Sequence, residues 1–435
     1  MMRGDFTGFC GKPGSGAPRD RGRAFVTNGV QVICAALVVL IFLLLPASAS
    51  GEGDTLVLVG SYTGLYYSRS VSAFNQHAFM GNWIHGLYVM DYSDPSNPES
   101  VAVHPGYGFD VEIEDGLAYC GGNDFYVKDA ASPEDTGLVG SCCLIGGPNF
   151  KVHVFGSLAL VLYYGSLHEI HLELIDVSEP SSPLFLSAVE AVPYGSIWWG
   201  DAYKKDDLVY WVDEAYLEAT DEFVGRILVF DIGDPINPVP ILVDTCLQAP
   251  GHAIWIEGDY AYVGEDYGGR GLMVFDVSDP YSIDSVGCFA IPEGRAWNVH
   301  VRGRYAYVCA HPDRVYVLDI SDPSTPTLVA SYDTPDQPRD IFVDEPYVLV
   351  RQNTSLSILE ASFLQPLPGD TNKDGVVDIG DAIFVLNYLF KGGPRPFPSQ
   401  VGDVNGDDTV DVGDVIYLLN YLFRGGSAPH SGSSK

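Results

Sequence analysis

One phrase recurs along this chain and limits its fold more than any other feature. The phrase is close to Val-x-Asp-Val-Ser-Asp-Pro; clear copies begin at residues 89, 174, 229, 274 and 317, and degenerate copies at 127 and 358. The acids that anchor the copies are mostly forty to fifty residues apart, and they are Asp91, Asp129, Asp176, Asp231, Asp276, Asp319 and Glu360. A repeat of this length indicates a chain assembled from small, similar units that bury a core only by packing together.

Each unit has the same internal order of expected strands. An alternating strand such as 254–256 comes first, an aromatic strand such as 260–263 follows, the phrase comes third, and a strand such as 327–332 comes last. Four short antiparallel strands per unit predict an all-β propeller of about seven four-stranded blades over residues 54–364. A β-solenoid is the alternative, but its rungs are usually shorter. Within the phrase, each Asp is expected to accept hydrogen bonds from the turn that follows it.

The two ends of the repeat region complement each other. The seventh unit lacks a fourth strand, whereas residues 55–62 resemble the fourth strands at 137–141 and 326–332. A strand that is missing at one end and spare at the other is what closure of a ring requires, because closure pairs edges that would otherwise be exposed. We therefore expect residues 56–59 to pair at the outer edge of the blade that contains residues 356–359.

The first 49 residues resemble an export signal. Arg19, Arg21 and Arg23 precede an apolar run at 32–45, and a small-residue stretch follows at 46–49. The run is shorter than the ~20 residues that span a bilayer, so a cleaved signal peptide is favoured over a transmembrane anchor, and the mature chain is expected to begin near Ser50 without a membrane span. Export leads to an oxidising compartment, where the six remaining cysteines are either free thiols or form one or two disulfides. These cysteines are Cys120, Cys142, Cys143, Cys246, Cys288 and Cys309.

The net charge excludes one class of partner. The chain has 23 Lys and Arg against 57 Asp and Glu, which gives a formal charge of −34. Nucleic-acid binding needs a basic surface that replaces counterions, and nothing in this composition supplies one.

The ends of the inner strands converge on the axis of a propeller and are candidates for ligand binding. Aligning the blades brings seven residues to one equivalent position: Ser70, Asp110, Lys151, Asp201, Ala253, Asn298 and Asp340. The residues one position earlier include Arg69, Phe109, Phe150, His252, Trp297 and Arg339. From these two sets the candidate ligand-binding residues are Asp110, Lys151, Asp201, Asn298, Arg339 and Asp340.

Three interpretations of these inner-strand residues stay open. Mixed polar and aromatic groups suit a sugar or a peptide, but the same residues could simply line a water-filled channel. Asp110, Asp201 and Asp340 could also supply the carboxylate pair of a glycosidase. The chain has no G-x-S-x-G, H-E-x-x-H or P-loop motif, and no catalytic residue is assigned.

The repeated phrase resembles the LVIVD repeat of secreted bacterial proteins over about residues 54–364. The resemblance implies a β-propeller and implies no established reaction.

After a linker at 365–368, two twelve-residue loops follow each other, at 370–381 and 403–414. Both carry oxygen-bearing side chains at positions 1, 3, 5, 9 and 12, which is the layout of a loop that wraps Ca²⁺. Two calcium sites are therefore predicted. The side-chain ligands would be Asp370, Asn372, Asp374, Asp378 and Asp381 in one loop and Asp403, Asn405, Asp407, Asp411 and Asp414 in the other, with the carbonyls of Val376 and Thr409. Position 6 is Gly375 in the first loop and Asp408 in the second, so the second site is expected to be weaker.

Each loop leads into a predicted helix, at 382–390 and 415–423, ended by a basic residue and two glycines. No helix is predicted to enter either loop. This duplicated pattern resembles a type I dockerin over residues 369–429, followed by a disordered tail at 430–435. The resemblance implies a small all-α, calcium-binding module and a cohesin-bearing partner. Many dockerins contact cohesin through a Ser-Thr-like pair at loop positions 10 and 11; here these positions are Ile379, Gly380, Val412 and Gly413, which leaves the cohesin class open.

Together these features predict an extracellular or cell-surface protein. Its propeller would recognise a glycan or protein ligand without catalysis, and its dockerin would attach it through calcium to a cohesin-bearing scaffold or cell surface. The alternatives are a polysaccharide-degrading enzyme carried on the propeller and a structural module for protein interaction.

Overall fold

The computed structural model describes most of the chain after residue 54. The described residues are 55–65, 68–82, 84–106, 108–145, 149–164, 170–190, 200–217, 222–247, 249–265, 270–292, 294–364, 367–372, 376–391, 393, 396, 399–407 and 409–430. The predicted signal peptide, part of the linker and all but one residue of the predicted tail lie outside them.

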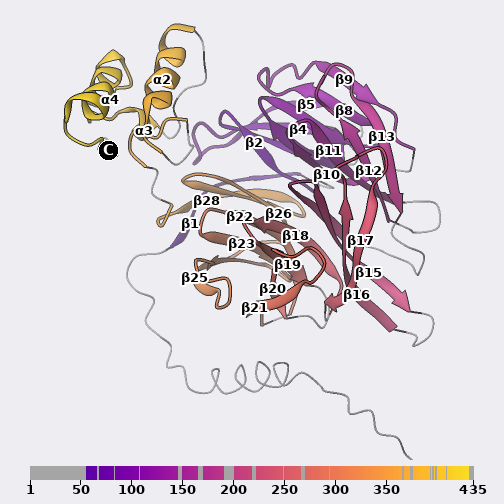
Figure 1. The fold of residues 1–435 in the computed structure, drawn as a ribbon. Helices are drawn as coiled ribbons and strands as arrows, with labels where there is room; N and C mark the ends of the chain where they lie inside the picture. The colour runs from indigo at the N-terminus through magenta and orange to yellow at the C-terminus, as the bar shows by residue number, and fades with distance from the viewer. Residues whose placement is uncertain are drawn as a thin grey trace, which may run out of the picture. The chain divides into compact units, whose positions relative to one another are not determined.

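Seven four-stranded antiparallel sheets make up the repeat region, which is a seven-blade β-propeller (Figure 1). From the inner to the outer strand, the first three blades are β2 (Ser72–Phe74), β3 (His77–Asn82), β4 (Gly86–Asp91) and β5 (Glu99–His104); β6 (Asp110–Glu114), β7 (Leu117–Gly121), β8 (Phe125–Asp129) and β9 (Leu138–Cys142); and β10 (Asn149–Phe155), β11 (Leu158–Tyr164), β12 (Ile170–Asp176) and β13 (Leu184–Glu190). The next three blades are β14 (Gly200–Lys205), β15 (Leu208–Leu217), β16 (Glu222–Asp231) and β17 (Val239–Leu247); β18 (Gly251–Glu257), β19 (Tyr260–Glu265), β20 (Gly271–Asp276) and β21 (Asp284–Ala290); and β22 (Ala296–Arg302), β23 (Tyr305–Ala310), β24 (Arg314–Asp319) and β25 (Thr327–Asp333). The predicted strand order within a unit is confirmed.

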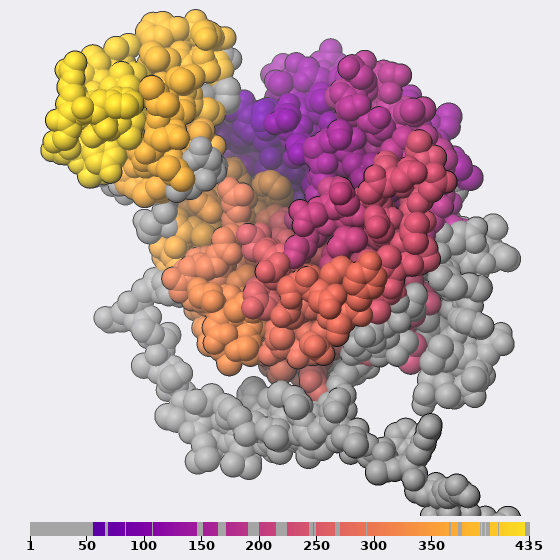
Figure 2. Space-filling model, viewed as in Figure 1, coloured from indigo at the N-terminus to yellow at the C-terminus, as the bar shows by residue number. Residues whose placement is uncertain are grey.

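The seventh blade closes the ring as predicted. It consists of β26 (Pro338–Asp344), β27 (Tyr347–Gln352), β28 (Ser355–Ala361) and the N-terminal strand β1 (Leu56–Thr63). β1 pairs with β28 in the register Leu56 to Ala361 and Tyr62 to Leu356, with an irregularity between Leu58 and Gly60. Figure 2 shows the colours of the blades following one another from indigo to orange, in chain order.

The core of the propeller is divided among the interfaces between blades. A separate cluster of buried hydrophobic residues lies at each of the seven interfaces. Between the third and fourth blades, for example, Leu160 and Leu174 pack near Trp211 and Phe230. A single twisted sheet has two faces to cover, so each blade depends on both of its neighbours for burial.

The repeated phrase stabilises the fold in two ways. Its Asp accepts the N–H of the residue two positions later in six blades, for example from Ser93 to Asp91 at 2.7 Å and from Ser321 to Asp319 at 2.9 Å. This confirms the predicted turn. Its Pro then lies against the outer strand of the preceding blade, so that a side chain at Gly140 would collide with the carbonyl of Pro180. The same close approach explains Gly60 and Gly287, which face the corresponding prolines of the first and sixth blades.

The described residues of the C-terminal region form two long helices and one short helix, α2 (Ile379–Lys391), α3 (Ser399–Gly402) and α4 (Val412–Arg424). Val385 and Leu418 belong to a small apolar core between α2 and α4. Both long helices begin three residues earlier than predicted. For α4 the reason is that Asp411 acts as N-cap, accepting the N–H of Gly413 at 2.5 Å. The expectation that no helix enters either loop is wrong for the second loop, because α3 ends directly before it.

Within the described part of the chain, the structure gives free thiols at Cys120, Cys142, Cys143 and Cys309. The alternative in which these cysteines form disulfides is therefore not observed. No described helix has the length and apolar character needed to span a bilayer.

Candidate functional site

The inner strands surround a cavity of about 100 Å³. Five of the six predicted ligand-binding residues line it, namely Asp110, Lys151, Asp201, Asn298 and Asp340. Arg339 does not line this cavity; its guanidinium lies over the ring of Trp297 instead. Aligning the blades thus identified a set of side chains that the fold brings together.

These side chains also connect neighbouring blades. At four of the seven equivalent positions, the side chain accepts a hydrogen bond from a backbone N–H of the next blade. The donor is the residue that directly follows the equivalent position in that blade. The bonds run to Ser70 Oγ from Val111 (3.1 Å), to Asp110 Oδ2 from Val152 (2.8 Å), to Asp201 Oδ2 from Ile254 (3.3 Å) and to Asp340 Oδ2 from Val71 (2.7 Å). At two further positions the side chain pairs with the carboxylate of the next blade: Asn298 Nδ2 donates to Asp340 Oδ1 at 2.8 Å, and Lys151 Nζ lies 3.8 Å from Asp201 Oδ2. The three aspartates that could have formed a glycosidase pair are thus each bonded to the next blade.

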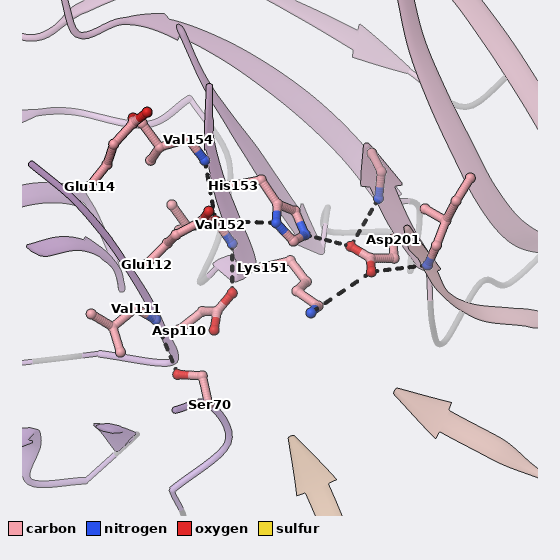
Figure 3. A network of polar contacts seen from close by, with 12 residues as sticks. Ser70, Asp110, Val111, Glu112, Glu114, Lys151, Val152, His153, Val154 and Asp201 are labelled. Atoms are coloured by element: carbon pink, nitrogen blue, oxygen red, sulfur yellow. Dashed lines mark hydrogen bonds and ion pairs between the residues drawn. The ribbon is translucent and has the colours of Figure 1, made fainter. Parts of the chain in front are cut away.

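A second layer of polar residues, which the sequence did not reveal, lies beside the first, two residues further along the inner strands (Figure 3). His153 is bonded on both sides, with Nε2 2.8 Å from Asp201 Oδ1 and Nδ1 3.2 Å from Glu112 Oε2. Glu112 also accepts the N–H of Val154 at 3.2 Å. Both residues stand two positions after a predicted site residue. Because alternate residues of a strand share a face, this spacing of two could have identified Glu112 and His153 as part of the site.

Burial and charge together set the protonation of this layer. Burial would lower the pKa of His153, but Asp201 and Glu112 outweigh it and raise the pKa to about 10. The pKa of Lys151 is also raised, because Asp201, Asp110 and Asp340 outweigh its burial. Burial raises the pKa of Asp340 to about 7 despite Lys151, with Asp110 adding to the rise. At neutral pH the cavity therefore holds an imidazolium, an ammonium and a carboxyl group close to its titration point.

These shifts predict that the propeller is less stable at high pH. Asp340 and His153 both have folded-state pKa values above their usual values, so the folded state binds more protons than the unfolded state. The free energy of unfolding that protonated Asp340 contributes should be lost as the pH rises from about 4 to 7. The contribution of protonated His153 should be lost as the pH rises from about 6.5 to 10. In denaturant melts, Asp340→Asn should reduce the loss between pH 4 and 7 by at least about 1 kcal/mol. Asp135→Asn, on an exposed turn, should keep the wild-type profile, and an Asp340→Asn profile identical to wild type would contradict the assignment.

A backbone irregularity recurs at the residue directly before the equivalent position in several blades. The register with the second strand skips residue 252 in β18, residue 297 in β22 and residue 339 in β26, so each of these inner strands carries an extra residue. A bulge of this kind re-aims one side chain out of the regular alternation. The rings of His252 and Trp297 lie 4.6 Å apart between centroids, and Arg339 Cζ lies 4.5 Å from the Trp297 centroid. The side chain of Phe150 lies outside the described residues.

In the C-terminal region, the last aspartate of each loop is fully buried and holds the loop. Asp381 accepts the N–H groups of Thr371 (2.7 Å), Asn372 (3.2 Å) and Asp378 (2.8 Å). Asp414 accepts the equivalent N–H groups of the second loop, from Val404 (2.9 Å), Asn405 (3.3 Å) and Asp411 (2.8 Å). The last aspartate thus makes equivalent bonds in the described parts of the two loops.

Family models match both parts of the chain. The LVIVD repeat matches residues 67–102, 170–190, 250–289 and 293–334, and the dockerin type I domain matches residues 368–422. The chain carries LVIVD repeats and a type I dockerin domain. The LVIVD matches fall on the first, third, fifth and sixth blades.

Solved structures resemble the propeller. A chain in the crystal structure of the mitotic checkpoint complex is 8% identical with a TM-score of 0.54, over 73% of this chain and 95% of that chain. The crystal structure of the WD40 β-propeller domain of Doa1 is 10% identical with a TM-score of 0.55, over 70% of this chain and 96% of that chain. At such identities the likeness shows the fold alone. A search among curated proteins found no match.

Type I dockerin domains bind calcium, and the dockerin loops have a suitable set of ligands. In the second loop the candidate side chains of Asp403, Asn405, Asp407 and Asp411 offer hard oxygens only, which is the set that Ca²⁺ prefers. Asp403 Oδ1 accepts the N–H of Asp407 at 3.0 Å. Within the described residues, no group of three or more acidic, histidine or cysteine side chains is placed to hold a metal ion.

The predicted cohesin-contacting residues differ in exposure. Ile379 is 50% and Val412 is 42% exposed. The two glycines that follow have a local explanation: a side chain at Gly380 or Gly413 would approach the oxygen of the preceding capping aspartate to 2.9 or 2.8 Å. The space beside the cap thus favours glycine at position 11 of each loop.

Proposed function

We propose that this protein is a secreted, non-catalytic recognition module. In this proposal the propeller binds an extracellular ligand and the dockerin domain attaches the protein, through calcium, to a cohesin-bearing scaffold or cell surface. The single observation that carries the proposal is the dockerin match at 368–422, whose two loops are held by equivalent bonds to Asp381 and Asp414. A dockerin suggests attachment to a cohesin, and such partners occur outside the cell or on its surface.

Two calcium ions are part of the proposal. The first would be held by Asp370, Asn372, Asp374, Asp378, Asp381 and the Val376 carbonyl, and the second by Asp403, Asn405, Asp407, Asp411, Asp414 and the Thr409 carbonyl. Bound calcium supplies positive charge that offsets the repulsion among the carboxylates. The role of the chain is to hold the loops against the helices, which Asp381 and Asp414 do through three backbone N–H groups each.

The partner surface would include exposed apolar residues at the starts of both long helices. Ile379 and Ile383 are each 50% exposed on α2, and their counterparts on α4, Val412 and Ile416, are 42% and 55% exposed. Residues four positions apart lie on one face of a helix. Each helix therefore presents a short apolar strip next to its calcium loop, as a partner-binding face would require.

The test is capture with the immobilised full chain from the culture medium of the source organism, with and without chelator. We expect the captured proteins to carry cohesin domains and to be lost when calcium is chelated. The double variant Ile383→Asp with Ile416→Asp should reduce capture at least about tenfold. Tyr281→Asp, a change at a similarly exposed apolar residue of the propeller, should leave capture unchanged. Captured proteins without a cohesin domain, or capture that resists chelation, would contradict the proposal.

A further inference from the structure

Arginine side chains gather at one place on a strongly acidic molecule. Arg295 and Arg339 both lie over the ring of Trp297, with Cζ 5.8 and 4.5 Å from its centroid. Arg69 occupies in the first blade the position that Arg339 occupies in the seventh, and the inner strands β2 and β26 are in contact. The pKa of Arg339 is lowered, first by burial and then by the positive charges of Arg69 and Arg295. We call Arg69, Arg295, Arg339 and Trp297 the arginine platform.

Arg339 is held in place while part of its guanidinium stays available. Its Nε donates to Asn353 Oδ1 at 2.7 Å, and Asn353 Nδ2 donates in turn to Asp336 Oδ1 at 3.2 Å. The ring of Trp297 fixes one face of the guanidinium. Among the described residues, none accepts a hydrogen bond from the Nη atoms of Arg339. Because Arg339 is the extra residue of a bulge in β26, the fold directs it out of the regular strand alternation.

A further buried arginine interacts electrostatically with Arg339. Arg351 stands opposite Asp340 in the register of β26 and β27, and it is fully buried. Its guanidinium donates to the backbone carbonyls of Leu65 (3.0 Å) and Ser68, and burial lowers its pKa to about 9. Asp340 and Asp336 offset part of this charge, and the remainder acts on Arg339 as positive potential.

A guanidinium held in this way suits a planar anion with two oxygens. A carboxylate accepts two parallel N–H bonds from arginine, which sets both its position and its orientation. The formal charge of −34 disfavours a polyanion, because its other charges would meet the acidic surface. At physiological salt the repulsion between charges is weak beyond about 8 Å. A ligand with a single carboxylate carries one negative charge, so it meets much less of that repulsion than a polyanion does.

We infer that the arginine platform binds the carboxylate group of an extracellular ligand, with Arg339 as the residue that contacts it. The inference rests on the proposed recognition function and names the chemistry of its ligand. A carboxylated sugar and the C-terminus of a peptide both supply this group, and the experiment distinguishes them.

The experiment is calorimetric titration of the full chain with three probes. D-glucuronate and methyl β-D-glucoside compare a sugar with and without the carboxylate, and N-acetylglycine presents a peptide-like carboxylate. We expect a carboxylate probe to bind and the neutral glucoside not to bind, with affinity that falls as salt is added. The probe that binds more tightly identifies the source of the carboxylate.

Variants then locate the site. Arg339→Gln should weaken carboxylate binding at least about tenfold, since a hydrogen bond to a charged group is lost. Arg314→Gln removes an exposed arginine that pairs with Asp333 on an outer strand, and it should leave binding unchanged. Trp297→Leu, which removes the support of Arg339, should weaken binding less than Arg339→Gln does. Equal binding by the glucoside, absence of binding by both carboxylates, or full binding by folded Arg339→Gln would overturn the inference. Capture through the dockerin domain is measured separately, so it still tests attachment if this inference fails.

Discussion

Deletion of residues 54–62 is expected to open the propeller. These residues supply all but the last residue of β1, which covers the outer edge of β28 from Ala361 to Ser355. Without them β28 becomes an exposed edge, and the clusters beside the seventh blade lose Leu56, Val59 and Tyr62. We expect the free energy of unfolding to fall by at least about 4 kcal/mol, the melt to lose cooperativity and the chain to aggregate. Thermal melts with light scattering measure all three effects.

A peptide added in trans provides the matched control. A synthetic peptide of residues 54–63 should restore the cooperative melt of the deletion variant by pairing with β28. The same peptide with Gly60→Ala should fail, because a side chain there would collide with the carbonyl of Pro95. A deletion variant that melts like the full chain and stays monomeric would show that β1 is not needed for closure.

Removal of calcium is expected to unfold the dockerin domain and leave the propeller folded. Helices α2 and α4 have thirteen residues each, and their shared core contains only a few buried residues. At calcium one hundred times the dissociation constant, each occupied site contributes about 2.7 kcal/mol, which is large for a module of this size. Chelator should therefore abolish most of the helical circular dichroism of the full chain while the main propeller transition remains.

Substitutions of the buried aspartates separate the role of the loop from that of the ion. Asp414→Ala leaves three loop N–H groups without an acceptor and should destabilise the dockerin domain by about 3 kcal/mol. Asp414→Asn keeps one acceptor oxygen and should lose less helix at the same calcium concentration. If Asp408 weakens the second loop, Asp381→Ala should reduce calcium affinity more than Asp414→Ala does. Helical circular dichroism that does not respond to chelator would contradict the calcium assignment.

Much of this fold could be predicted because its constraints are local and repeated. The period of the Asp-Pro phrase predicted four strands per unit, and the spare strand at 55–62 predicted the closure that β1 and β28 form. The equivalent positions of the inner strands could also be aligned, because every blade begins its inner strand in the same way. Asp201 occupies its predicted place at the cavity although the sequence around it is among the least regular.

What the sequence could not supply depends on contacts between blades. The bonds from Asp110 to Val152 and from Asp340 to Val71 join residues far apart in the chain, and so do those from His153 to Asp201 and Glu112. Whether such a carboxylate is free to bind a ligand or already holds the next blade is decided by packing.

The sequence by itself predicted a propeller of about seven blades, the closure of the ring and the dockerin loops, because each depends on a local pattern that repeats. Only the tertiary structure decided which inner-strand residues are bonded and which are available. It placed Arg339 on Trp297 through a bulge and left its Nη atoms without an acceptor among the described residues. The physical reason is that the direction of a side chain at a bulge, and the burial that shifts its pKa, arise only when neighbouring blades meet.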